Sequence, residues 1–224
     1  MVQTSADEEL PAGAFLPWLD EIRGALVGER DADVPCGSCT ACCTASQFVH
    51  IAPDETDALA HIPSSLLFRA PRLPRGHVLM GHDEHGHCPM LVDGRCSIYA
   101  HRPRTCRTYD CRVFAAAGLE PDDERKVLIA DRARRWRFSF PDGAGRAELV
   151  AVRAAATFLV EHPHVLPDGV AASNVTQVAV LAVEVHDAFV AGTPPPDAAL
   201  VTVRAGGGRV RRGQRTTAAS PPPV

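Results

Sequence analysis

Eight cysteines give this sequence its clearest chemical signal, and the first four follow the pattern C-x2-C-x2-C-C. A thiolate is a soft donor that suits zinc, Cu(I) and iron–sulfur clusters, and the C-x2-C step lets two sulfurs reach one centre. The sequence therefore predicts that all eight cysteines bind metal. They are Cys36, Cys39, Cys42, Cys43, Cys88, Cys96, Cys106 and Cys111.

The adjacent pair Cys42 and Cys43 leaves two arrangements open. Neighbouring side chains usually point in different directions, so both sulfurs are not expected at one mononuclear site. One arrangement has two four-sulfur sites, one taking Cys42 and the other Cys43. The other has one [4Fe–4S] cluster on Cys36, Cys39, Cys42 and a distal cysteine, with the remaining cysteines structural. The expected cofactor is zinc or an iron–sulfur cluster, with [4Fe–4S] favoured if the metal is iron.

Histidines and arginines near the cysteines are weaker candidates. Imidazole binds metals, but the cysteines alone can fill the site, so the histidines before Cys88 are expected in a solvated loop. The lone His50 and His101 are expected to be structural. Arginines around Cys106 and Cys111 either offset thiolate charge and donate hydrogen bonds to sulfur or form ordinary salt bridges, and the sequence leaves both roles open. The loop histidines are His82, His85 and His87, and the arginines are Arg102, Arg107 and Arg112.

Composition narrows the class of protein and its compartment. The net charge of -4 over 224 residues gives no general case for binding nucleic acid. The first ten residues are acidic and lack the basic and apolar parts of a signal peptide. No apolar run reaches the length of about 18 residues that indicates a membrane span. We therefore expect a cytoplasmic protein, in which clustered cysteines bind metal more often than they form disulfides.

Hydrophobic periodicity predicts an α-rich α+β fold. Helices are expected over 14–29, 121–137, 147–161 and 174–191, the last with Asn174 as its N-cap. Short strands are expected over 47–52 and 77–80, with a loop over 62–76 between them. Asp93-Gly94 predicts a hairpin whose open ends carry Cys88 and Cys96, and Pro103 begins a short helix that carries Cys106.

These elements predict one domain with a tail at each end. Residues 1–11 are expected to be flexible, 12–191 to form a single cysteine-cluster metal-binding domain, and 192–224 to be a disordered tail rich in Pro, Gly and Arg. Within the domain, a small irregular metal-bound lobe (33–115) with a short β-hairpin packs on the C-terminal helices (121–191). Those helices could also contact a protein partner.

The cysteine pattern resembles that of a known family. The order C-x2-C-x2-C-C, then Cys-Pro-x-Leu, then Cys-Ser-Ile-Tyr-x-x-Arg-Pro-x-x-Cys-Arg is similar to the YkgJ-type cysteine-cluster (CxxCxxCC) family, described as a zinc- or iron-chelating domain. The likeness covers residues 36–112, and Asp110-Cys111-Arg112 looks like a subgroup feature. The family includes a domain found in flagellin lysine N-methylases, so the resemblance implies a metal centre and a link to protein methylation. The matching positions are Cys36, Cys39, Cys42, Cys43, Cys88, Pro89, Leu91, Cys96, Ile98, Tyr99, Arg102, Pro103, Cys106 and Arg107.

Three functions fit these observations. The first is a metal-binding protein with a cysteine-ligated zinc or iron–sulfur centre that serves structure, metal handling or electron transfer. The second, implied by the resemblance, is a flagellin or protein lysine N-methylase-like enzyme that uses the cluster, although the sequence has no glycine-rich S-adenosylmethionine signature after a strand. The third is a thiol redox sensor that uses the region of Cys42 and Cys43. No catalytic residue is assigned.

Overall fold

The computed structural model describes residues 8–166 and 174–192, apart from the single positions 33, 72, 122 and 142. Most of the predicted flexible N-terminus, residues 1–7, and all of the predicted tail beyond Gly192 lie outside the described residues. Within the described part, no helix combines the length and the apolarity that crossing a membrane requires.

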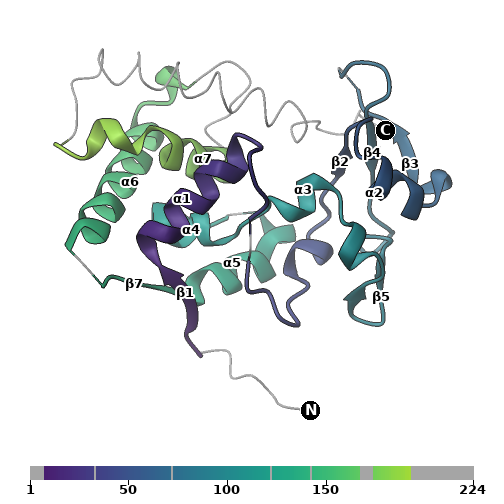
Figure 1. Ribbon diagram of the computed structural model, residues 1–224, viewed down its shortest axis with the longest axis horizontal. Coiled ribbons are helices and arrows are strands. Elements are labelled where there is room, and N and C mark those ends of the chain that lie inside the picture. The colour runs from purple at the N-terminus through teal and green to yellow at the C-terminus, as the bar shows by residue number, and fades with distance from the viewer. Residues whose placement is uncertain are drawn as a thin grey trace.

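A group of helices forms the larger part of the molecule, on the left of Figure 1. Helix α6 (Gly143–Glu161) packs against α7 (Val175–Val185), and α4 (Arg112–Ala117) packs against both. Helix α1 (Phe15–Leu26) closes this group, and α5 (Val127–Arg135) packs on α4. Their apolar faces share one core, because residues at helical spacing point to one side. Buried members include Phe15, Ile22, Phe114, Val152, Leu159 and Leu181.

The helices predicted from periodicity are present, with different ends. Asn174 caps α7 as predicted, because its side chain accepts a hydrogen bond from the Gln177 amide at 3.2 Å. Helix α7 ends at Val185 and is followed by the 3-10 helix η6 (His186–Phe189). The other 3-10 helices are η1 (Ala41–Thr44), η2 (Ser64–Leu66), η3 (Tyr99–His101), η4 (Glu124–Lys126) and η5 (Pro163–Val165).

The stretch predicted as a helix over 121–137 contains a break and a strand. Helix α5 ends at Arg135, and strand β7 (Trp136–Ser139) pairs in parallel with β1 (Leu10–Ala14), which the sequence did not reveal. From Trp136 onward the aromatic and polar residues alternate, which is the period of a strand. Phe138 packs edge-on against Phe15 with ring centroids 5.1 Å apart, so the strand fixes the start of α1.

Small antiparallel sheets form the other side of the molecule. Strands β2 (Val49–Ile51) and β4 (Val78–Met80) occur where they were predicted, and they pair in a sheet of order β2-β4-β3. Strand β3 (Leu67–Arg69) lies inside the stretch predicted to be loop, so that interpretation was wrong there. This sheet and helix α2 (Thr56–His61) enclose a second, smaller core. Its buried members are Val49, Ile51, Ala58, Ile62, Met80, Met90 and Ile98.

The predicted hairpin is confirmed. Strands β5 (Leu91–Val92) and β6 (Arg95–Cys96) are joined by two residues with positive φ, Asp93 at 49° and Gly94 at 71°. A two-residue turn needs this left-handed backbone to match the twist of the strands, and Asp-Gly supplies it at low cost. Helix α3 (Arg104–Arg107) follows Pro103, as expected.

His50 makes the stability of the sheet side depend on pH. Its side chain is buried, and Nε2 lies 2.8 Å from Nδ1 of His77, so it is not the lone residue expected from the sequence. Burial first, and then the charge of His77, lower the pKa of His50 from 6.5 to about 4. Between these two values the unfolded chain binds the proton and the folded chain does not, so stability falls as the pH falls.

We therefore expect the free energy of unfolding to decrease by about 2 kcal/mol from this residue between pH 7 and pH 5. Urea unfolding at both pH values, for the natural protein and His50→Gln, measures it. Between pH 7 and pH 5 the natural protein should lose more stability than His50→Gln, which has no imidazole to protonate at this position. Equal losses would show that His50 does not titrate in this way.

Candidate metal centre

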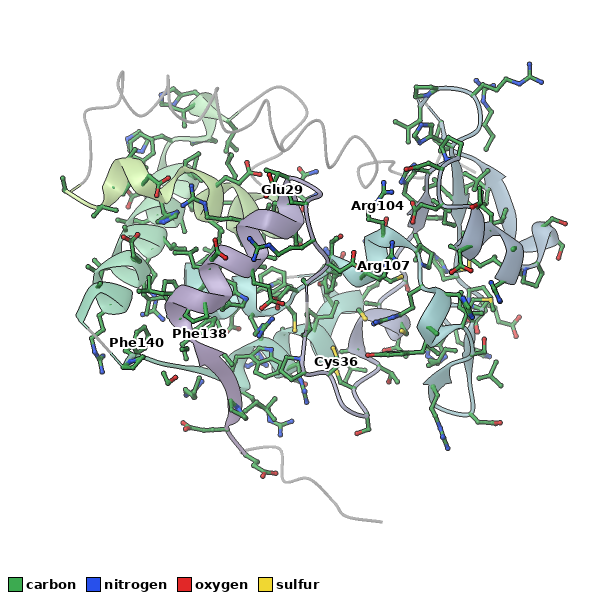
Figure 2. The ribbon with its side chains drawn as sticks, in the orientation of Figure 1. Glu29, Cys36, Arg104, Arg107, Phe138 and Phe140 are labelled. Atoms are coloured by element: carbon green, nitrogen blue, oxygen red, sulfur yellow. The ribbon has the colours of Figure 1, made fainter. Side chains whose placement is uncertain are left out.

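All eight cysteines line one cavity of about 620 Å³. None of them forms a disulfide. The cavity lies between the helical core and the smaller core of the sheet side, since its lining residues come from both. In Figure 2, Cys36 is seen between the two halves of the molecule, with Arg107 toward the sheet side.

The first four cysteines lie on a turn and on η1. Gly37 adopts φ 57°, and the Cys39 amide donates to the carbonyl of Cys36 at 2.9 Å, which closes the turn between them. Arg132 of α5 donates from Nη2 to the carbonyl of Cys36 at 3.2 Å. The helical part therefore anchors the start of the motif through its backbone.

The later cysteines arrive on separate elements. The amide of Cys88 donates to the carbonyl of Cys43 at 2.7 Å, which brings the hairpin segment against the C-x2-C-x2-C-C run. Cys96 ends β6, and Cys106 lies on α3, which packs on β2. Cys111 is the N-cap of α4 and so belongs to the helical part.

Packing divides the cysteines into two groups. Cys39 and Cys111 pack against the helical core, whereas Cys88, Cys96 and Cys106 pack against the sheet-side core. Cys43 joins the second set through its backbone bond to Cys88. Cys42 and Cys43 meet between the two sets, with their sulfurs 4.0 Å apart. We call Cys36, Cys39, Cys42 and Cys111 the helix-side group, and Cys43, Cys88, Cys96 and Cys106 the sheet-side group. Cys36 belongs to the first because it neighbours Cys39 and Cys111. Cys42 neighbours both Cys36 and Cys106, and it is placed in the first group to complete a set of four.

The electrostatics of the thiols follow the same division. In the sheet-side group, burial and then the neighbouring thiols of Cys88, Cys43 and Cys96 raise the pKa of Cys106 to about 12. Burial and the same kind of neighbours raise the pKa of Cys88 to about 11. Thiols that are held together and away from water resist ionisation unless a cation compensates them. A bound metal ion supplies that compensation.

The helix-side group behaves in the same way. Burial, and then the charges of Asp110, Cys36 and Cys39, raise the pKa of Cys111 to about 12. Burial and then Cys39 raise the pKa of Cys36. At the junction, the sulfur–sulfur hydrogen bond raises the pKa of Cys42 and lowers that of Cys43.

Arg102 is the cation that reaches both groups. Its charge lowers the pKa of Cys36 in one group and of Cys43, Cys96 and Cys106 in the other, in each case against a larger effect of burial. The guanidinium is held over the Tyr99 ring at 3.7 Å, and Nε donates to the Tyr99 carbonyl at 2.8 Å. Arg102 and Arg107 line the cavity, so both can offset thiolate charge as predicted.

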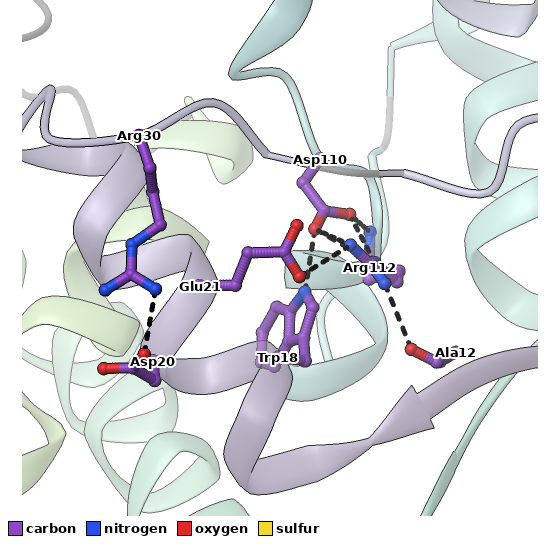
Figure 3. A network of polar contacts seen from close by, with 7 residues as sticks. All are labelled: Ala12, Trp18, Asp20, Glu21, Arg30, Asp110 and Arg112. Atoms are coloured by element: carbon purple, nitrogen blue, oxygen red, sulfur yellow. Dashed lines mark hydrogen bonds and ion pairs between the residues drawn. The ribbon is translucent and has the colours of Figure 1, made fainter.

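Arg112 takes the salt-bridge role, one of the two that the sequence left open for these arginines. It does not line the cavity; its guanidinium is buried and pairs with Asp110 at 2.9 Å (Figure 3). Nη1 also donates to the Ala12 carbonyl of β1 at 3.1 Å, and Trp18 donates from Nε1 to Asp110 at 2.7 Å. This network holds Asp110 and Arg112, the residues on both sides of Cys111, and so fixes the position of the Cys111 thiol at the cavity.

Trp136 is a site residue that the sequence reading missed. Its indole Nε1 donates to Sγ of Cys111 at 3.2 Å, and this bond lowers the thiol pKa against the effect of burial. Arg132, which holds the carbonyl of Cys36, lies over the Trp136 ring at 4.8 Å. Both tryptophans of the chain therefore donate to the Asp110–Cys111 pair. The alternation of aromatic and polar residues that begins at Trp136 was the available signal.

The histidines do not join this site. None of the residues that line the cavity is a histidine, and His82 and His85 are exposed in a turn organised by Asp83, which accepts the amides of His85 and His87 at 2.9 and 2.8 Å. His101, expected to stand alone, stacks on His61 outside the cavity. The arrangement is therefore a thiol-only site with arginines beside it.

These features define a cysteine-cluster domain built around one thiol-lined cavity. Residues 35–128 match the family model described as "CxxCxxCC: Putative zinc- or iron-chelating domain", so this part of the chain is similar to that family. The comparison with curated proteins and the comparison with solved structures gave no match. The family likeness supports chelation of zinc or iron and leaves the ligand and the role to be derived from the site.

Proposed function

We propose that this protein binds two iron–sulfur clusters, one on the helix-side group and one on the sheet-side group of cysteines. The single observation that carries the proposal is the gathering of all eight thiols around one cavity. Each group supplies four sulfurs, the number that a [4Fe–4S] cluster requires. Such clusters supply one-electron chemistry, and two of them in one cavity suit electron transfer.

The spacing of the sulfurs favours clusters over single zinc ions. In a tetrahedral zinc site the sulfurs lie about 3.8 Å apart, because each Zn–S bond is about 2.3 Å. Among the described residues, which include every cysteine, no three thiols have their sulfurs within 4.8 Å of one another. A cluster fits wider spacing, because its ligand sulfurs bind different iron atoms.

Anaerobic purification tests the proposal. The visible spectrum, iron, zinc and acid-labile sulfide are measured on the same sample. We expect a broad band near about 400 nm and about eight iron and eight sulfide per chain. About four of each would support one cluster and refute the second. A colourless protein with one or two zinc ions would refute clusters and leave two thiolate zinc sites.

Trp136 should tune the helix-side centre. Removing the N–H group with Trp136→Phe keeps an aromatic ring in the core but deletes the hydrogen bond to Cys111. Hydrogen bonds to ligand sulfurs raise the reduction potential of a cluster, so the variant should have a more negative potential. Anaerobic redox titration measures this shift for each centre.

Trp18→Phe is the matched control for Trp136→Phe, since Trp18 donates to Asp110 and not to sulfur. It should change the potential less than Trp136→Phe does. Equal shifts in the two variants would mean that the bond to sulfur has no special effect.

A further inference from the structure

Two histidines and an aspartate converge outside the thiol cavity. Asp57 and His61 lie one turn apart on α2, and His101 ends η3, which packs on α2. Nδ1 of His101 is 2.9 Å from Oδ2 of Asp57, and Nδ1 of His61 is 3.6 Å from Oδ1 of the same carboxylate. Ligand atoms around a tetrahedral zinc ion lie about 3.4 Å apart, since Zn–N and Zn–O bonds are about 2.1 Å. The existing separations bracket that value.

The two imidazole rings are stacked face to face. Their centroids are 3.5 Å apart, and the planes differ by 5°. This stack holds the two imidazoles next to each other beside the Asp57 carboxylate. The neutral ring is the form that binds metal, and a bound ion can replace the proton shared with Asp57.

The charges around this cluster leave Asp57 available to a cation. The nearby arginines already have acidic partners: Arg104 pairs with Asp54 at 2.9 Å, and Arg107 pairs with Asp31 at 3.4 Å. The hydrogen bond from His101 lowers the pKa of Asp57, so this carboxylate is ionised at neutral pH. All three side chains reach solvent.

A similar group on the helical side is less suited to a cation. Glu148, His186 and Asp187 also bring one ligand atom each within 4.8 Å of the others. There, however, Arg23 binds both oxygens of Asp187 at 3.2 and 2.7 Å. A metal ion would have to displace or face that guanidinium. Asp57 accepts no arginine hydrogen bond among the described residues.

The geometry points to a metal site separate from the cysteine groups, for a divalent ion of the zinc type, at Asp57, His61 and His101. Two imidazoles and a carboxylate suit such an ion and leave a position for water. His101 lies between Tyr99 and Arg102 in the chain, and both of these line the thiol cavity. The site is therefore on the rim of the cavity and uses none of its cysteines.

Zinc titration followed by NMR of the histidine rings tests this site. Long-range ¹H–¹⁵N spectra of the anaerobically purified full chain are recorded as Zn²⁺ is added. The ring signals of His61 and His101 should shift together and before those of the other histidines. Because the readout is on these rings, it does not depend on what the thiols hold, so it can fail or succeed independently of the proposed clusters.

Substitutions complete the test. His101→Ala and Asp57→Asn should each weaken zinc binding at the remaining rings by about tenfold or more. The control is His85→Ala, which removes a more exposed histidine in the loop before Cys88. Circular dichroism verifies that these surface changes leave the fold intact. If zinc first shifts the rings of His82, His85 or His87, or if His101→Ala binds zinc as His85→Ala does, the proposal is overturned.

Discussion

Replacing Cys106 by serine should remove about half of the bound iron and sulfide and leave the rest. Cys106 packs on the sheet-side core beside Cys88, Cys96 and Cys43, so its loss opens only the sheet-side group. We expect about four iron and four sulfide per chain instead of about eight, with the visible band reduced by half. Metal and sulfide analysis of the anaerobically purified variant measures this.

The reciprocal variant separates a two-group site from a single shared one. Cys39→Ser lies on the helix side, so it should also lose about four iron while keeping the other four. The double variant should then be free of iron. If either single substitution removes all the metal, the eight thiols hold one centre and the division into two groups is wrong. Ser38→Ala is the control, because Ser38 lies between Cys36 and Cys39 but has no thiol. It should keep the full content of iron and sulfide.

Local sequence signals predicted those features of the fold that depend on neighbouring residues. Asp93-Gly94 predicted the hairpin because a two-residue turn needs left-handed backbone at both positions. Asn174 predicted the start of α7 because its side chain can accept a free amide of the first turn. The even spacing of apolar residues likewise predicted the helices that form the larger core.

Contacts between distant segments could not be predicted in this way. The parallel pairing of β1 with β7 joins segments more than 120 residues apart in the chain, and no local pattern encodes it. The same holds for the grouping of the cysteines. The bond from the Cys88 amide to the Cys43 carbonyl decides that Cys43 belongs with the sheet side. Spacing along the chain left this choice open, because Cys42 and Cys43 are adjacent and differ by a single residue in their separation from every other cysteine.

Polar partners were the least predictable part of the site. Arg112 follows Cys111 directly, so its charge seemed available to sulfur, but a buried carboxylate on the other side of Cys111 binds it instead. A buried guanidinium needs a charged partner and filled hydrogen bonds, and Asp110 provides the partner closest in sequence. The donor to sulfur is then Trp136, whose position depends on where α5 ends.

Asp110→Ala is expected to destabilise the protein by about 3–5 kcal/mol, because it removes the close charge partner of the buried Arg112 guanidinium and leaves the carboxylate of Glu21 at 4.0 Å. The Nε1 donor of Trp18 loses its acceptor in the same step. Urea unfolding measures the loss. Glu9→Ala breaks the exposed pair with Arg137 and should cost less than about 1 kcal/mol.

A double variant decides whether the loss of stability comes from the Arg112 charge that Asp110 no longer neutralises. Adding Arg112→Met to Asp110→Ala removes that charge and fills the space, so it should recover part of the stability. A double variant less stable than Asp110→Ala alone would contradict this account. Because both residues flank Cys111, Asp110→Ala should also release iron from the helix-side group while Cys43, Cys88, Cys96 and Cys106 keep theirs. That pattern would show that the buried ion pair serves the site as well as the fold.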